Sequence, residues 1–526
     1  MSSRRQTGPS RSSGVRAPAP QAARVVPVGL AACLAIALGG CASVDPRADF
    51  QRSAEQVRDH TGAEDSFDPD TEAAIEQRVM DLREGGLTVD EAVALALLNN
   101  PSFQAIFQDI GVSRADVVQS GLLSNPTLSL GFRLPEGGGR AEVTAGLAQQ
   151  IVDLWQIPMR KRIAEAQLER TVTSVVAQAT VLAADVRDKY YRLLASQRAE
   201  ELAAENLHLI EQSLELAQAR LRAGDVGPLD VNLVRMNLLD AQVERESVRQ
   251  DLMMAELALA GALGLSRSDA PVTLDGALPK PQPIRENEDD LLTLADERRL
   301  DLRAAGLALT AAENELEREC MNVFPSIVVG IAGERTERRG LADRDILADT
   351  ARSSIAAGKP TAPSIQSRAQ RDQARRQVID ALLGATVAIA LPIWDQNQAH
   401  IAKARFEVIR RRKLLDAAYD GAARQVKEAF RRAMIAQELA EFFEDEVLPQ
   451  ATQNVEGARS LYRTGEQGVL ALLEAQEMLV QQRRRSVSIL QDYALARVDL
   501  ELAVGGRLPE ATGTPSGPSS APESEE

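Results

Sequence analysis

Histidine, cysteine and aromatic residues are scarce in this chain of 526 residues. It contains three His and three Cys, and Phe, Trp and Tyr together make up 3% of the sequence. So few ligands leave little material for a zinc or iron–sulfur site, and we expect no cofactor. So few aromatic rings also argue against a surface that stacks bases. The 76 Asp+Glu against 60 Lys+Arg give a net charge of −16, which argues against nucleic acid as a partner.

Features that would indicate catalysis are also missing. The sequence has no GxGxxG or Walker phosphate loop and no Ser/His/Asp order, and His60, His208 and His400 lie far apart along the chain. The adjacent pair Met253-Met254 is more typical of helix packing than of a soft-metal site. We therefore predict that the protein is not an enzyme and that it has no structural metal.

Residues 1–40 predict an export signal that ends in a lipidation site. Five arginines precede an apolar run over residues 25–38, which is too short to span a membrane as a helix. The following LGGC, ending at Cys41, resembles a bacterial lipobox. We expect cleavage before Cys41 and a lipoprotein that carries lipid (palmitate) on this residue. No Asp follows Cys41, which in lipoproteins of this type implies sorting to the outer membrane. The alternative is an ordinary signal peptide with an incidental Cys.

The rest of the chain is built twice. The segment Arg222–Leu229 (RAGDVGPL) matches Arg463–Leu470 (RTGEQGVL), and IAEA at Ile163 matches IAKA at Ile401. A period above 200 residues indicates a duplicated domain, because solenoid repeats are about 20–50 residues long. The predicted parts are an N-terminal periplasmic segment (41–86), a first repeat (87–264), a linker (265–290), a second repeat (291–505) and a disordered tail (506–526).

Each repeat contains two predicted strands in which apolar residues alternate with small or polar ones. The strands are expected at 127–134 and 142–152, and at 326–333 and 385–393. Period two gives a sheet with one apolar face, and the lengths are close to the ~9–11 residues that cross a membrane. A soluble, half-buried sheet is the alternative for any single strand. The long charged segment 334–383 is predicted to be a loop outside the cell.

Two long helices carry apolar residues at heptad spacing. They are predicted at 159–222 and 396–464, and at ~1.5 Å per residue each would reach ~90–100 Å. Glycine-containing tip turns at 224–228 and 465–468 lead into return helices at 229–263 and 469–504. Rods of this length are not needed in a globule of this mass, although a plain antiparallel coiled coil would share the pattern.

The strands and helices together predict an oligomer. Four amphipathic strands cannot close a membrane barrel, and open sheet edges are not viable in lipid. Three copies would pool twelve strands. The predicted fold class is therefore mainly α, with a duplicated helix–strand–strand–helix repeat. A homotrimer of it forms a 12-stranded membrane β-barrel, continued by a long α-helical barrel.

This layout resembles the TolC family of outer-membrane efflux channels over about residues 87–505. The resemblance is carried by the two R-x-G-x-x-G-x-L turns and by the strand-to-helix junctions. The junction LPIWDQNQ, residues 391–398, is similar to the CusC- and CzcC-like heavy-metal branch. The resemblance implies a passive outer-membrane duct that extends into the periplasm. It also implies docking to a membrane-fusion adaptor and to an inner-membrane pump of the resistance–nodulation–division type.

The cargo and one alternative function stay open at this point. The branch implies heavy-metal cations as the cargo, and organic solutes or drugs are the alternative. A lipid-anchored periplasmic coiled-coil scaffold or adaptor is a further alternative, which the strands and the duplication disfavour.

The tip turns supply the candidate site residues. Gly224 and Gly465 each end a helix where a left-handed residue is wanted. A tight hairpin there is expected to expose an adaptor-docking surface. Its further members are Leu221, Arg222, Tyr462 and Arg463.

A ring of carboxylates is the second expectation at the tips. The resemblance implies that acidic side chains after the second turn surround a closed entrance. Glu474 takes that position, Glu477 lies one turn further, and Asp230 is the equivalent in the first repeat. Ala471 departs from the family, in which an acid is common. Three carboxylates around a narrow axis would attract cations, whereas the alternative is a set of solvated surface acids.

Overall fold

The structure is a computed structural model, and all of its elements belong to the unit Asp45–Glu526. The described residues are 42–69, 72–83, 85–134, 141–224, 226–266, 272–323, 326–338, 355–358, 378–464 and 466–508. The predicted signal and lipidation site (Cys41), Gly465, and all but three residues of the predicted tail lie outside them.

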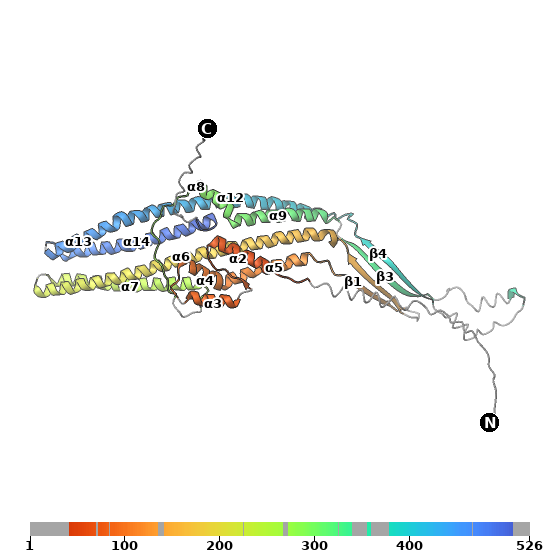
Figure 1. Ribbon diagram of the computed structural model, residues 1–526, viewed down its shortest axis with the longest axis horizontal. Coiled ribbons are helices and arrows are strands. Elements are labelled where there is room, and N and C mark those ends of the chain that lie inside the picture. The colour runs from red at the N-terminus through yellow and green to blue at the C-terminus, as the bar shows by residue number, and fades with distance from the viewer. Residues whose placement is uncertain are drawn as a thin grey trace, which may run out of the picture. The chain divides into compact units, whose positions relative to one another are not determined.

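The helices and strands occur in the same order in both halves of the chain (Figure 1). The N-terminal segment holds α2 (Arg47–Thr61) and α3 (Glu72–Arg83). The first repeat consists of α4 (Val89–Asn99), α5 (Pro101–Ser120), β1 (Thr127–Arg133), β2 (Glu142–Gln150), α6 (Asp153–Ala223) and α7 (Pro228–Ala262). The second consists of α8 (Glu288–Arg298), α9 (Leu300–Met321), β3 (Ile327–Arg338), β4 (Val378–Ile389), α12 (Gln398–Phe442), the π-helical η3 (Phe443–Val447), α13 (Leu448–Thr464) and α14 (Val469–Val504). The predicted mainly α, duplicated fold is confirmed.

The four described strands form one antiparallel sheet in the order β1-β2-β3-β4. β2 and β3 come from different repeats and pair in the middle, so β1 and β4 are the edges. Cross-strand partners place Leu128, Leu147 and Ile331 in one row on the same face. The register therefore gathers the apolar positions of all four strands on one side of the sheet.

The second hairpin is longer than the alternation predicted. Pairing of β3 with β4 continues to Arg338↔Val378, so residues 334–338 and 378–383 belong to strands and not to the predicted 334–383 loop. Backbone pairing depends on N–H and C=O groups rather than on side-chain polarity, so it runs on past the last apolar residue. Of the remainder of that loop, only residues 355–358 are described.

The two long helices differ from each other. Helix α6 is unbroken over 71 residues and begins six residues earlier than predicted. At its start the Asp153 carboxylate accepts the Ser124 N–H at 2.8 Å and pairs with Arg160 at 3.1 Å. The predicted helix 396–464 is interrupted by η3. Pro449 explains this break, because it has no N–H to donate to the carbonyl of Asp445.

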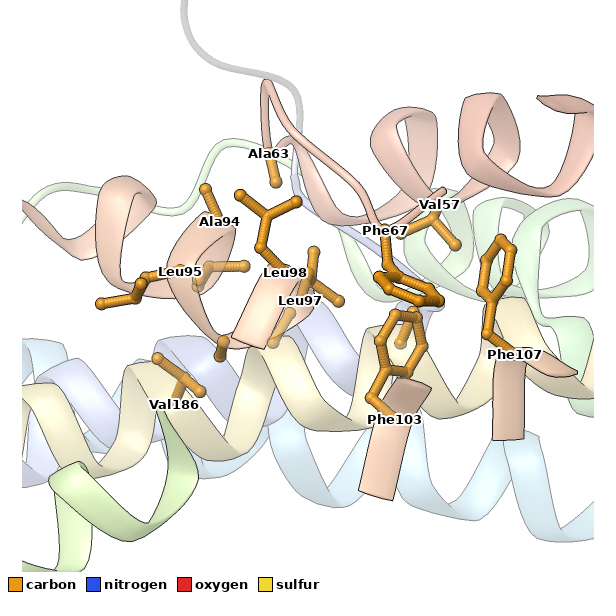
Figure 2. Close-up of a cluster of buried hydrophobic side chains, with 14 of the residues drawn as sticks. Val57, Ala63, Phe67, Ala94, Leu95, Leu97, Leu98, Phe103, Phe107 and Val186 are labelled. Carbon is orange, nitrogen blue, oxygen red and sulfur yellow. The ribbon is translucent and has the colours of Figure 1, made fainter. Parts of the chain in front are cut away.

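The main core lies where α2, α4 and α5 pack against α6. Figure 2 shows Phe67 and Phe103 beside Phe107, with ring centroids 5.6 and 5.9 Å from that of Phe107. Phe107 has 0% exposure, as does Val186 on α6. The N-terminal segment is thus part of the core, and it packs against one side of the N-terminal half of α6.

A joint occurs twice, where each return helix meets a pair of shorter helices. In the first repeat Asn100 Nδ2 donates to the Ala262 carbonyl at 2.9 Å. In the second, Arg299 Nη1 donates to the Ala503 carbonyl at 2.9 Å. In both cases the residue between two short helices satisfies a free carbonyl at the end of the return helix.

A glycine in the left-handed region completes each joint. Gly264 has φ 73° and Gly505 has φ 92°. A Cβ on Gly264 would lie 2.6 Å from the Asn99 carbonyl oxygen, and one on Gly505 would lie 3.0 Å from the backbone of Arg299. Glycine is therefore required both for the conformation and for the close approach.

Candidate functional site at the hairpin tips and the bare sheet

The α6–α7 hairpin turns at Gly224, as the motif predicts. This residue has φ 83°, and its N–H donates to the Leu221 carbonyl at 3.1 Å. In the α13–α14 hairpin the Glu466 N–H donates to the Leu461 carbonyl at 3.0 Å. Both tips are thus tight turns closed by backbone hydrogen bonds.

The two tips are joined by a small apolar cluster with members from all four helices. Its buried residues are Ala217, Val231, Val234, Tyr462, Leu472 and Leu473. Tyr462 is 4% exposed, so the expectation that this ring is displayed for docking is wrong. The ring is covered because the second hairpin lies against the first, a contact between segments more than 200 residues apart. The guanidinium of Arg220, which the sequence did not single out, lies over it.

The large apolar side chains that are exposed at the tips are not the ones expected. Leu229 and Leu470 are 69% and 57% exposed, whereas Leu221 is half-buried against the apolar cluster. Both leucines are the last residue of the R-x-G-x-x-G-x-L motif, which was the signal that could have found them. Arg222 and Arg463 are exposed beside them, as expected.

The candidate acidic residues differ in their surroundings. The Asp230 carboxylate is half-buried and accepts the Gly227 N–H at 3.0 Å, which caps the start of α7. Glu474 and Glu477 are exposed on α14, and Glu477 accepts from Gln481 at 3.3 Å. Asp230 therefore has a local structural role, while Glu474 keeps its carboxylate in solvent.

Ion pairs link the helices further from the tips, one of them between the two hairpins and one within the first hairpin. Arg484 of α14 pairs with Glu244 of α7 at 2.7 Å, and Arg245 of α7 pairs with Glu200 of α6 at 3.3 Å. These side chains are partly exposed, so each pair contributes at most about 1 kcal/mol. Their main effect is to fix how the neighbouring helices are aligned along their lengths.

The sheet carries a second candidate surface. Leu128, Leu130 and Phe132 are 65%, 61% and 70% exposed, and Val387 and Ile389 are 64% and 50% exposed. The opposite face holds small and polar residues in rows, for example Thr127, Ala148, Gly330 and Thr386. An apolar face of this size that is left uncovered indicates contact with lipid or protein.

Two helices at the margins of the helical layer also leave apolar residues uncovered. On α7 these are Leu229, Leu233, Met236, Val243 and Leu257, and on α12 they are Phe406, Ile409, Ile435, Leu439 and Phe442. Each set has helical spacing and lies on a different face from the buried residues of the same helix. Each margin therefore offers a stripe to a partner.

Two further properties bear on the kind of protein. Within the described ranges, no helix is both long and apolar enough to cross a membrane. In the same part of the chain, no group of three or more His, Cys, Asp or Glu could hold a metal ion.

A duplicated helical rod with a bare amphipathic sheet is the architecture of an outer-membrane channel subunit. The model of the outer membrane efflux protein family matches residues 92–265 and 291–506, which lie over the two repeats. The chain belongs to this family. Its members are efflux channels of the outer membrane and are not enzymes.

Several known proteins are similar to this chain over most of its length. The cobalt-zinc-cadmium resistance protein CzcC of Cupriavidus metallidurans is 23% identical over 433 residues, which cover 80% of this chain and 90% of that protein. The structure of CusC matches with a TM-score of 0.62 at 17% identity, over 80% of this chain and 92% of that one. The outer-membrane channel OprN matches with a TM-score of 0.60 at 18% identity, over 82% and 92%. At these identities the two structures show the shared fold.

Proposed function

We propose that three copies of this chain form the exit duct of a tripartite efflux system in the outer membrane. The observation that carries this proposal is the bare apolar face of the sheet together with its two unpaired edges, β1 and β4. In lipid an open edge would leave N–H and C=O groups without partners. Four strands are too few for a barrel, whereas twelve from three copies can close.

The margins of the subunit support a head-to-tail arrangement. β1 and α7 belong to the first repeat, and β4 and α12 belong to the second. In our proposal β1 of one copy pairs with β4 of the next, and the α7 stripe covers the part of the α12 stripe nearest the tips, which holds Ile435, Leu439 and Phe442. Such a heterologous interface closes into a ring when the rotation per copy is 120°, as in a trimer.

The tips are the proposed docking surface for the periplasmic adaptor, which connects the duct to an inner-membrane pump of the resistance–nodulation–division type. Leu229 and Leu470 supply apolar contacts there, and Arg222 and Arg463 supply charge. Glu474 is the proposed carboxylate of a ring at the entrance. Lipid on Cys41 would hold the N-terminal segment at the outer membrane, with the helices extending into the periplasm.

Heavy-metal cations are the proposed cargo. The resemblance to CzcC, whose name records cobalt, zinc and cadmium resistance, supports this choice, and so does the junction at residues 391–398. The duct would conduct passively, since a pore needs only sufficient width and a tolerable charge. Organic solutes are the alternative. Restoration of cobalt, zinc and cadmium tolerance in a strain lacking its own exit duct, without restored drug tolerance, would separate the two.

Conductance in planar bilayers, with the mass of the purified protein determined in the same sample, tests the channel itself. Discrete, cation-preferring steps from a trimer are the expected result. A monomer or dimer without conductance would contradict the proposal and favour a lipid-anchored periplasmic scaffold. A trimer that stays silent should become conducting when Tyr462→Ala loosens the apolar cluster that joins the two tips.

A further inference from the structure

We propose that Trp155 and Trp394 lie in the headgroup region of the phospholipid leaflet and mark the periplasmic boundary of the membrane. This inference rests on the proposed function, because it presupposes that the sheet spans the outer membrane. It goes further in naming the residues that fix the depth at which the protein sits.

The two residues are the only tryptophans in the sequence. Trp155 follows β2 and Trp394 follows β4, so each comes after the second strand of its repeat. Each also precedes the matching IAEA or IAKA segment, at Ile163 and Ile401, at a distance that agrees within one residue. The duplication thus places both rings at the same level, where the sheet gives way to the long helices.

Both side chains are available to a partner. Trp394 is 87% exposed and Trp155 is 42% exposed. Leu154 and Ile393 next to them are 64% and 63% exposed, so the junctions are apolar as well as aromatic. The indole ring combines a large apolar surface with an N–H donor, a combination that favours the boundary between hydrocarbon and water.

The apolar face ends in charge at the other end of the sheet. Ile327, Val329, Ile331 and Gly333 share one face of β3, and the next residue on that face is the exposed Arg335. The eight steps from Ile327 to Arg335 rise ~27 Å along the strand, or ~20 Å across a membrane at a tilt of about 40°. The short step from the strand ends to the tryptophans extends this to about the 25 Å height of an outer-membrane apolar band.

Exposed cations follow the tryptophans on the long helices, in the second repeat after the exposed acid Asp395. Lys161 and Arg162 are exposed on the third turn of α6, and Lys403 and Arg405 are exposed near the start of α12. Long basic side chains at this depth can extend back toward lipid phosphates. The order is therefore apolar strand, tryptophan, cation in both repeats, which is the order of layers across half of a bilayer.

Because there are only two tryptophans, their own fluorescence tests the proposal. Trp155→Phe and Trp394→Phe each leave one tryptophan, and trimer mass and circular dichroism check that each variant folds. Each is reconstituted into phosphatidylcholine vesicles with a nitroxide on the headgroup, on carbon 5 or on carbon 12 of the acyl chain. We expect the headgroup and carbon-5 labels to quench both variants about twofold more than the carbon-12 label.

A third variant separates this inference from the proposed function. Leu130→Trp in the double Phe background places a ring midway along the apolar face of β1, where the carbon-12 label should quench best. If Leu130→Trp behaves so while either native tryptophan is quenched only by aqueous acrylamide, or best by the carbon-12 label, the sheet spans the membrane and our assignment of the boundary is wrong. If no labelled lipid quenches Leu130→Trp, the spanning function itself fails.

Discussion

The guanidinium of Arg220 lies 4.6 Å from the centroid of the Tyr462 ring and connects the two hairpins at their tips. Arg220 belongs to the last turn of α6 and Tyr462 to the last turn of α13. The ring also fills the apolar cluster shared by α7 and α14. A single aromatic side chain thus provides both packing and a cation–π contact across the boundary between the repeats.

Removing this ring should loosen the tips. Tyr462→Ala deletes the cation–π contact and leaves a cavity in the apolar cluster, at a cost of ~3–5 kcal/mol. We expect faster hydrogen exchange of the amides at residues 466–474 and a higher open probability in planar bilayers. Tyr462→Phe keeps the ring and should exchange like the unchanged protein. Equal exchange in the Ala and Phe variants would show that the ring does not hold the hairpins together.

The second joint should not tolerate a side chain at its glycine. Gly505 has φ 92°, and a Cβ there would lie 3.0 Å from the backbone of both Arg298 and Arg299. Gly505→Ala should therefore cost more than ~1 kcal/mol and lower the Tm of the detergent-solubilised protein, by about 1 °C for each kcal/mol in a chain of this length.

Gly457→Ala is the matched control for this effect. Gly457 lies inside α13 with no atom within 4 Å of a Cβ, and alanine there should leave the Tm unchanged or raise it. Equal melting of the Gly505 and Gly457 variants would mean that the close approach at the joint is relaxed in solution.

The order of helices and strands could be predicted because each depends on a local period. Heptad spacing along α6 and strict alternation in β1 are visible in single segments, and the turn at Gly224 follows from its motif. The oligomer followed from the number of strands, because four strands cannot close a barrel whereas three copies supply twelve, and the family resemblance agreed with a trimer.

The failures concern contacts between distant segments. Tyr462 looked exposed because it stands beside a turn, and only the first hairpin, more than 200 residues earlier, buries it. The extra length of β3 and β4 follows from backbone pairing that side-chain alternation does not report. The π-helical break before Pro449 is a local feature, because proline has no N–H to donate to the Asp445 carbonyl, whereas the heptad spacing of apolar residues indicates only a continuous helix.

Acid should weaken the packing of α2 through His60. Burial lowers the pKa of this side chain below its usual value, and Arg298 and Arg303 lower it further, against an opposing effect of Asp59. The folded state thus prefers the neutral ring. Its contribution to stability is present above about pH 6.5 and is lost as the pH falls through the lower folded pKa.

Replacement of His60 should therefore make the Tm depend less on pH below neutrality. His60→Gln should reduce the fall in Tm between pH 7 and pH 5, measured on the detergent-solubilised protein. His208→Gln is the control, because that side chain is 70% exposed on α6 and its polar contacts are with Glu211 and Gln212 of the same helix. If the Tm of the His60 variant falls with pH as steeply as that of the unchanged protein, His60 is not the cause of the acid sensitivity.

A ring of Glu474 carboxylates should make the entrance bind cations. The side chain is exposed on α14 just past the second tip, and in a trimer its three copies would surround one axis. Mutual repulsion of the carboxylates favours a divalent cation between them. The bound divalent cation then blocks the monovalent ions that carry the current. Glu474→Gln should weaken block of the single-channel current by divalent cations about tenfold, or ~1.4 kcal/mol. Glu456→Gln, an exposed acid further back on α13, should leave the block unchanged. If both variants are blocked like the unchanged protein, Glu474 is a solvated surface acid, and any cation preference of the duct must arise elsewhere along the pore.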